Sequence, residues 1–204
     1  FDISKLITPE LFLSTGAEFR QENFIANAGE EASYAGGGAQ SFPGLQPQNA
    51  IDAKRTNVGA YIDLGFDPSP NFFIGAAARA EKYSDFGNNV SFKLNSRIKT
   101  SDDKFSVRGS ISTGFRAPSL HQIFLSNIQT LISGGTVSNQ GTFNNNSPVL
   151  RKLGVGQLKD EEAINISVGL ATRPSDNFFA SVDLFQIDVD DRIVYSSSIA
   201  SDDP

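Results

Sequence analysis

The stretch SVRGSISTGFRAPSL, residues 106–120, alternates between two kinds of side chain before it ends at an Arg-Ala-Pro corner. Its odd-numbered positions are mostly apolar as far as Phe115, while its even-numbered positions carry serine, glycine and the arginines Arg108 and Arg116. Successive side chains of a β-strand point to opposite faces. The stretch therefore predicts a strand at 104–116 with one apolar face and one polar face.

The same period of two recurs along the chain and predicts a β-protein with little helix. The predicted strands lie at about 10–22, 54–66, 71–83, 89–100, 104–116, 161–173 and 177–190. In the last of them the apolar positions change phase after Leu184, and we expect a β-bulge there. The predicted fold class is all-β, an antiparallel up-and-down meander of about seven long strands.

The connections between the predicted strands differ in length. DPSP (67–70), SDD (101–103) and PSD (174–176) are expected to be tight turns, because Asp, Pro and Ser favour turn conformations. The links 23–53 and 117–160 are long. Transmembrane β-barrels have short turns on one side of the membrane and longer loops on the other, so the pattern favours part of such a barrel.

Strand length supports the same interpretation. A strand of about 13 residues at roughly 3.3 Å per residue reaches about 43 Å, whereas about 9–11 residues suffice to cross a bilayer at a tilt. The apolar face would then contact lipid, and the polar face would line the lumen. Arg108 and Arg116 would lie in a wet or protein-filled interior.

The longer link contains a stretch with helical spacing that begins at Leu120. Ser119 followed by Gln122 is a capping-box pattern, and the glycines at 134–135 are typical of a helix end. We therefore predict a short amphipathic helix at about 120–132, with its apolar side on the rim or wall of the barrel.

Composition restricts the possible partners and sites. The 204 residues have a net charge of -6, which argues against nucleic acid as a partner. The absence of cysteine excludes disulfides and thiolate chemistry. No apolar run is long enough for a transmembrane helix. The chain starts on Phe1 with no visible signal peptide, and we expect it to be an internal piece of a longer protein.

Two segments carry a family resemblance. GAAARAEKYSDFG (75–87) and SVRGSISTGFRAPSLHQIF (106–124) resemble the TonB-dependent outer-membrane receptors of Gram-negative bacteria. LKDEEAINISVGL (158–170) and FFASVDLFQIDVDDRIV (178–194) are similar to the strand pair that follows in that family. In the family pattern the first of this pair opens with a proline-containing acidic stretch, and LKDEEA lacks the proline.

The resemblance implies that residues 1–204 are part of the β-barrel domain of such a receptor, in the outer membrane and in contact with lipid. It implies import of a scarce nutrient complex such as a siderophore, cobalamin, haem or glycan. The energy would come from a TonB-type system acting through a plug domain, which this sequence lacks. No cofactor is implied.

Charged residues at the expected lumenal positions are candidates for the substrate path or for contact with the plug: Arg79, Glu81, Lys93, Arg97, Arg108 and Arg116. The alternative is that they form cross-strand pairs that keep a polar wall solvated. His121, the only histidine, is a candidate loop ligand because imidazole binds iron. A solvated loop position is the alternative that we favour.

Neither a metal site nor catalysis is expected. Asp183, Asp188, Asp190 and Asp191 could supply oxygen ligands to Ca²⁺, but their spacing does not match an EF-hand, and a solvated strand end is favoured. No pattern indicates catalytic residues. The chief rival is a non-transporting surface or periplasmic ligand-binding β-sheet protein, and an envelope hydrolase comes third.

Overall fold

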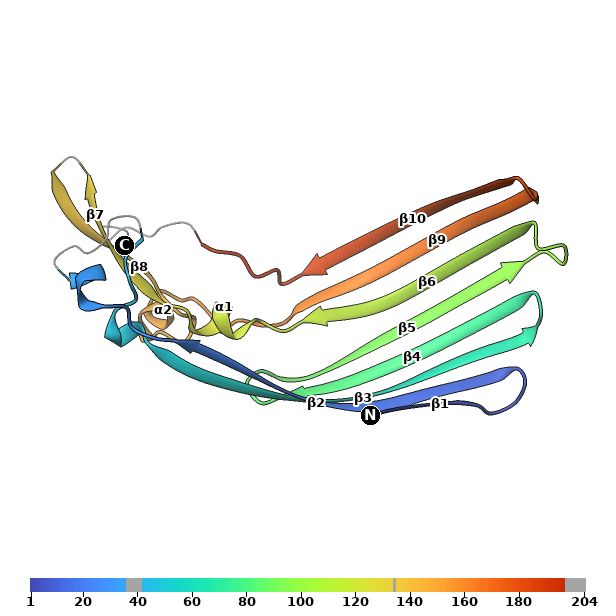
Figure 1. The fold of residues 1–204 in the computed structure, drawn as a ribbon, viewed down its shortest axis with the longest axis horizontal. Helices are drawn as coiled ribbons and strands as arrows, with labels where there is room; N and C mark the ends of the chain where they lie inside the picture. Colours follow the sequence, from blue (N-terminus) through green and yellow to red (C-terminus); the bar gives the residue numbers. More distant parts are fainter. Residues whose placement is uncertain (36–41, 134, 197–204) are drawn as a thin grey trace.

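The computed structural model describes residues 1–35, 42–133 and 135–196, and it shows one large antiparallel sheet (Figure 1). In spatial order its eight strands are β1 (Asp2–Leu6), β2 (Leu11–Ala26), β3 (Ile51–Ser69), β4 (Phe72–Tyr83), β5 (Gly87–Lys99), β6 (Phe105–Arg116), β9 (Glu161–Ser175) and β10 (Phe178–Asp190). A separate hairpin pairs β7 (Asn127–Ser133) with β8 (Thr136–Thr142). The described helices are short: α1 (Leu120–Phe124), α2 (Pro148–Lys152), and the 3-10 helices η1 (Glu31–Ser33) and η3 (Pro47–Asn49).

The predicted all-β antiparallel meander is confirmed. Each predicted strand range coincides with one strand of the large sheet. β2, β3, β5 and β9 are longer than predicted, with 19 residues in β3, whereas β4, β6 and β10 match the prediction to within a residue at each end. β1 was not predicted, because a five-residue edge strand is too short for alternation to identify it. It forms by pairing with β2, from Asp2 opposite Gly16 to Leu6 opposite Phe12.

The two ends of the sheet differ, as the connection lengths predict. Short turns join the strands at one end: 7–10, 70–71, 100–104 and 176–177. The opposite end holds the long links 27–50 and 117–160 together with the tight turn 84–86. Within the longer link lie α1, the β7–β8 hairpin and α2, all beyond the end of the sheet (Figure 1).

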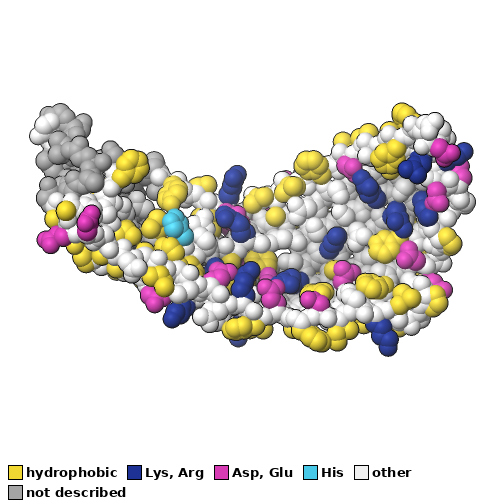
Figure 2. Space-filling view, viewed as in Figure 1, with side chains coloured by type: hydrophobic (Ala, Val, Ile, Leu, Met, Phe, Trp, Pro, Cys, Tyr) yellow, Lys and Arg dark blue, Asp and Glu magenta, His cyan; other side chains and the backbone are white. Residues whose placement is uncertain are grey.

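The sheet has two chemically different faces. We call the face that carries Arg79, Lys93 and Arg108 the polar face; Figure 2 shows basic and acidic side chains across the sheet, with many hydrophobic ones along the outline. The opposite, apolar face is open. Its directly paired Leu94, Ile111 and Ile166 are 48, 47 and 44% exposed, so no second layer of the described chain covers them.

A small core lies at the end with the long links. The buried apolar residues of the described chain are Ala53 on β3, Tyr83 at the end of β4 and Leu120 on α1. α1 contacts β2 and β3 there. The packed part of the molecule is therefore the place where the longer link folds back onto the wall.

The predicted bulge near Leu184 is wrong. β10 pairs with β9 without interruption from Ala180 to Asp190, and the irregularity lies between Phe178 and Ala180. The backbone ladder is kept while the side-chain pattern changes, so the apolar residues after Leu184 fall on the polar face: Phe185, Ile187 and Val189.

The predicted helix at 120–132 is also too long. α1 ends at Phe124, and residues 127–133 form β7 instead. The segment contains β-branched residues at every second position, Ile128, Thr130 and Ile132, which suits a strand as well as a helix. Pairing with β8 decides for the strand. No described helix is long and apolar enough to cross a membrane.

The register of β10 can be tested by disulfide formation, because the chain has no cysteine of its own. Ile187 and Asn165 are direct partners, so the double variant Ile187→Cys, Asn165→Cys should cross-link readily in the full-length protein. The double variant Ile187→Cys, Ile166→Cys should not, because these side chains point to opposite faces. Cross-linking is read on non-reducing gels. Preferential cross-linking of the second pair would show that the strand does have a bulge near Leu184.

Candidate functional site

Arg79 holds two carboxylates together on the polar face. Its Nη2 atom lies 2.8 Å from Glu18 Oε2 on β2 and 2.8 Å from Glu81 Oε1 on its own strand. β3 lies between β2 and β4, so the contact with Glu18 crosses a whole strand. Two of the predicted residues, Arg79 and Glu81, are thus brought together in one charge cluster.

Arg108 makes a similar contact across β9. Its guanidinium binds both carboxylate oxygens of Asp183, with Nη2 at 2.7 Å from each and Nε at 3.0 Å from Oδ1. The residue between them is Gly169, the direct partner of both. A Cβ atom at 169 would overlap Asp183 Oδ1 and lie 2.7 Å from Arg108 Nε, so the ion pair requires glycine there.

Arg116 pairs with Glu161 where β6 and β9 reach the long links. Nε lies 2.8 Å from Glu161 Oε2 and Nη2 lies 2.5 Å from Oε1. The backbone N–H of Ile193 also donates to Oε1, at 2.8 Å. The pair therefore connects the β6–β9 junction to the segment that follows β10.

Lys93 and Arg97 differ from the other predicted cations. Among the residues that the structure describes, neither has a carboxylate within ion-pair distance. Arg97 lies 5.9 Å from the centre of the Phe73 ring and stands directly opposite Arg108, whose charge Asp183 compensates. The uncompensated positive charge of the predicted set is thus concentrated on β5.

The buried Arg55 fastens the longer link to the wall, and it was not among the predicted site residues. Its side chain is 4% exposed. Nη2 donates to Glu22 Oε2 at 2.5 Å, and Nη1 donates to the carbonyl of Pro118 at 2.7 Å and to Asp85 Oδ2 at 3.4 Å. We call this group of four residues the Arg55 corner.

The Arg55 corner positions α1. Ser119 caps the helix: its hydroxyl accepts from the Gln122 backbone N–H, and the Gln122 side chain accepts from the Ser119 backbone N–H, so the predicted capping box is present. His121 is exposed, and its ring packs edge-on against Phe24 at 5.6 Å between centroids. It lines neither of the two pockets described next.

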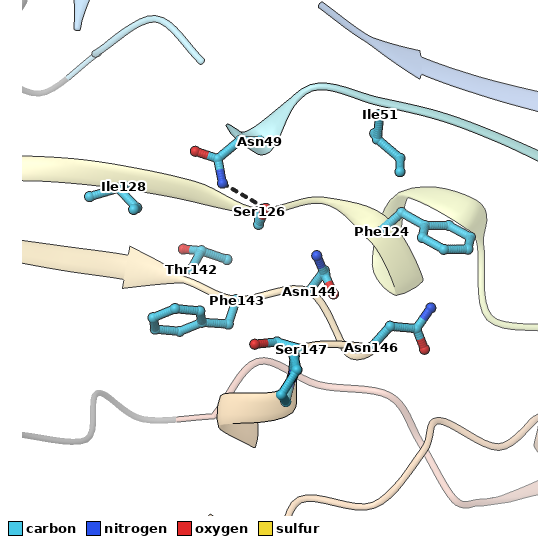
Figure 3. Close-up of a pocket in the computed structure, with 11 residues that line it drawn as sticks. Asn49, Ile51, Phe124, Ser126, Ile128, Thr142, Phe143, Asn144, Asn146 and Ser147 are labelled. Carbon is cyan, nitrogen blue, oxygen red and sulfur yellow. Dashed lines mark hydrogen bonds between the residues drawn. The ribbon is translucent and has the colours of Figure 1, made fainter. Parts of the chain in front are cut away.

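One pocket, which we call the junction pocket, lies where the two long links meet (Figure 3). Its volume is about 420 Å³. Three segments line it: 49–51 from the first link, and 124–128 and 142–148 from the second. Asn49 Nδ2 donates to Ser126 Oγ at 2.8 Å and joins the links directly. Both long links therefore line one pocket.

A second pocket, of about 540 Å³, lies between the β4–β5 turn and residues 156–160. It shares Phe124 and Asn146 with the junction pocket. Its wall carries charge, with Asp85, Lys159 and Asp160.

Asn145 holds the loop beside both pockets in place. It is 8% exposed; its Nδ2 donates to the Gly156 carbonyl at 3.1 Å, and its Oδ1 accepts from the Leu158 N–H at 2.9 Å. Arg151 donates to the Asn145 carbonyl. The sequence signal for this residue was poor, because it lies in the run NNNS, which is generic for loops.

Phe115 and the acidic residues of β10 lie differently from what the sequence indicates. Phe115 was assigned to the apolar face, but its ring packs edge-on against Tyr83 at 6.0 Å. The pairing of β6 with β5 ends at Ser112, so the end of β6 is free to turn inward. Asp183 and Asp188 lie on opposite faces of β10, so they do not form one ion site, and the described residues contain no cluster suited to a metal.

These features define a class of protein: the curved wall of an antiparallel barrel with two pockets at the long-loop end. The family model described as "TonB dependent receptor-like, beta-barrel" matches residues 4–204. The chain belongs to this family, and its strands are part of an outer-membrane barrel.

Known relatives agree with this placement. The chain is 27% identical over 187 residues to the ferric enterobactin receptor PirA of Pseudomonas aeruginosa, covering 91% of the chain and 24% of that receptor. In structure it is similar to a mutant of the ferric enterobactin receptor PfeA from Pseudomonas aeruginosa, with a TM-score of 0.67, 17% identity, and coverage of 92% of the chain and 26% of PfeA. The RagAB peptide transporter gives 0.56 at 13% identity, covering 92% and 22% of the respective chains. These two structures show the shared fold alone.

The Arg55 corner predicts a specific effect on the longer link. Arg55→Met leaves Asp85 and the Pro118 carbonyl without their donor, while Glu22 keeps Arg20 at 3.1 Å. The change should destabilise the corner by about 2 kcal/mol, less than for a fully buried pair because both acids are partly exposed. Limited proteolysis of the full-length protein should then cut within 117–160 more readily. Lys54→Met, an exposed neighbour on the other face, is the control. Equal cleavage of both variants would show that the corner does not hold the link.

Proposed function

We propose that the chain is part of an outer-membrane receptor that imports a ferric siderophore. The similarity to PirA carries this proposal, because it extends over 91% of the chain and includes both long links. The chain spans 24% of PirA's length, so transport is a property of a larger protein to which these strands contribute. The junction of the two links supports ligand capture at the loop end of the wall.

The proposed energy source is a TonB-type system that acts through a plug domain inside the barrel. Lys93 and Arg97 support a role for the polar face in that arrangement, because their charges have no partner among the described residues. An anionic iron complex, or acidic side chains of a plug, would compensate them. Arg79, Arg108 and Arg116 are already paired, and we assign them to the stability of the wall.

The contacts of His121 argue against haem as the substrate. Its ring packs on Phe24 and lines neither pocket, so it is poorly placed to ligate iron held there. Cobalamin and glycans have no specific observation in their favour. We propose no catalytic role for the chain, since the family consists of receptors and transporters.

We further propose that the apolar face contacts lipid. Its exposed residues form a continuous band across neighbouring strands, as membrane barrels require. In the rival interpretation, a surface or periplasmic protein, a second protein layer would cover the same residues.

Fluorescence quenching separates these two interpretations. The chain has no tryptophan, so Phe105→Trp on the apolar face and Phe73→Trp on the polar face provide a matched pair of probes once other tryptophans of the full-length protein are replaced. In vesicles with brominated acyl chains, the probe at 105 should be quenched strongly and the probe at 73 weakly. Equal, weak quenching would support a covering protein layer.

Iron uptake tests the function itself. Cells that produce the full-length receptor should take up iron(III) from a siderophore complex, and cells without it should not. The double variant Lys93→Gln, Arg97→Gln should lower uptake about five- to tenfold through lost electrostatic attraction. Lys82→Gln, which removes a positive charge on the other face, is the control. No uptake by the wild type would refute the function, whereas unchanged uptake by the double variant would refute only the role of these two residues.

A further inference from the structure

The junction pocket is a concave surface to which both long links contribute. Asn49 comes from the first link, and Asn144 and Asn146 come from the second. Its volume of about 420 Å³ is in the range of small-molecule sites, which begins at about 300 Å³. The hydrogen bond between Asn49 and Ser126 fixes the two links relative to each other.

The lining of this pocket has a definite chemistry. It contains amide and hydroxyl side chains with two aromatic rings, Phe124 and Phe143, and no charged residue. An anion that left water for this site would find no compensating cation there, whereas a neutral group with hydroxyl or amide functions would find both donors and acceptors. The rings offer apolar surface to the carbon skeleton of such a group.

Several polar atoms in the pocket are free to bind a ligand. The side-chain amides of Asn144 and Asn146 make no hydrogen bond to any described residue, and Figure 3 shows Asn144 pointing toward Ser126. Asn49 Oδ1 also has no donor within the described chain, but it is buried and points away from the pocket, so the amides of Asn144 and Asn146 are the groups available to a ligand.

We infer that the junction pocket binds an uncharged group that carries hydroxyl or amide functions. The inference rests on the proposed function, since this group is part of the nutrient complex that the receptor imports. It assigns the neutral organic portion of the ligand to the link junction and leaves the anionic portion to cations elsewhere. A separate neutral saccharide would satisfy the same chemistry.

Binding measurements on the purified full-length receptor distinguish the possible sources. The probes are a neutral iron(III) trihydroxamate complex, an anionic iron(III) triscatecholate complex and a neutral trisaccharide. Asn144→Asp removes the amide donors and adds a charge. For whichever neutral probe the wild type binds, this variant should raise the Kd by about tenfold, the effect of one good hydrogen bond. Phe143→Ala should weaken the same probe.

Asn88→Asp is the matched control, because Asn88 is exposed on the β4–β5 hairpin and lines neither pocket. It should leave the Kd unchanged. If Asn144→Asp has no more effect than Asn88→Asp, or if it weakens only the anionic complex while Phe143→Ala leaves that complex unchanged, the inference is overturned. Binding of the trisaccharide alone, with loss in Asn144→Asp, would support the pocket and refute the siderophore proposal. Binding of no probe to the wild type would overturn both.

Discussion

The structure depends on the backbone hydrogen-bond ladder that joins each strand of the large sheet to its neighbours. Each strand of the large sheet except the two edge strands pairs on both sides, and the pairing between β2 and β3 alone runs from Leu11 to Ala26. In a bilayer, unpaired backbone groups would have no water to bind. Keeping the backbone paired therefore matters more for stability than placing every apolar side chain on the apolar face. β10 shows this priority. Its apolar pattern changes phase after Leu184, yet its register does not.

The reversal on β10 has a physical explanation in the proposed bilayer. On the apolar face, Ile164 is the apolar residue of β9 nearest to the long-link end. Its partner on β10 is Asp188, which already lies beyond Leu184 in the direction of that end. Barrel strands are tilted by roughly 35–45°, so a flat membrane boundary crosses neighbouring strands at different points of the register. Beyond that boundary the outer face meets water, and Gln186 and Asp188 there can hydrogen-bond to each other. In the proposed bilayer, the phase change would lie where the strand leaves the hydrocarbon.

The sequence allowed the wall to be predicted well and the loop end poorly, for different reasons. Long strands with one apolar face repeat their signal many times, so the alternation located all the strands except those of seven residues or fewer: β1, β7 and β8. Residues 127–133 suit both helix and strand locally, and only pairing with β8 decides between them. The pockets were beyond prediction, because Asn49 and Ser126 are separated by 77 positions and no periodicity connects them.

The Arg55 corner explains how an irregular link obtains a fixed place without a sheet to order it. The corner has one cation and two carboxylates, and Arg20, outside the corner, supplies a second cation by contacting Glu22 at 3.1 Å. The four charges therefore balance. A buried arginine is tolerated only when its donors are satisfied, and Arg55 meets this condition partly with the carbonyl of Pro118, at the start of the link. The buried charge of Arg55 is satisfied only when the Pro118 carbonyl lies beside it, and this requirement holds the start of the link in one position. The β4–β5 turn supplies Asp85 and the link supplies Pro118, and both of these residues line the second pocket. A buried charge on the wall therefore holds two lining residues of the second pocket and anchors the link that also lines the junction pocket.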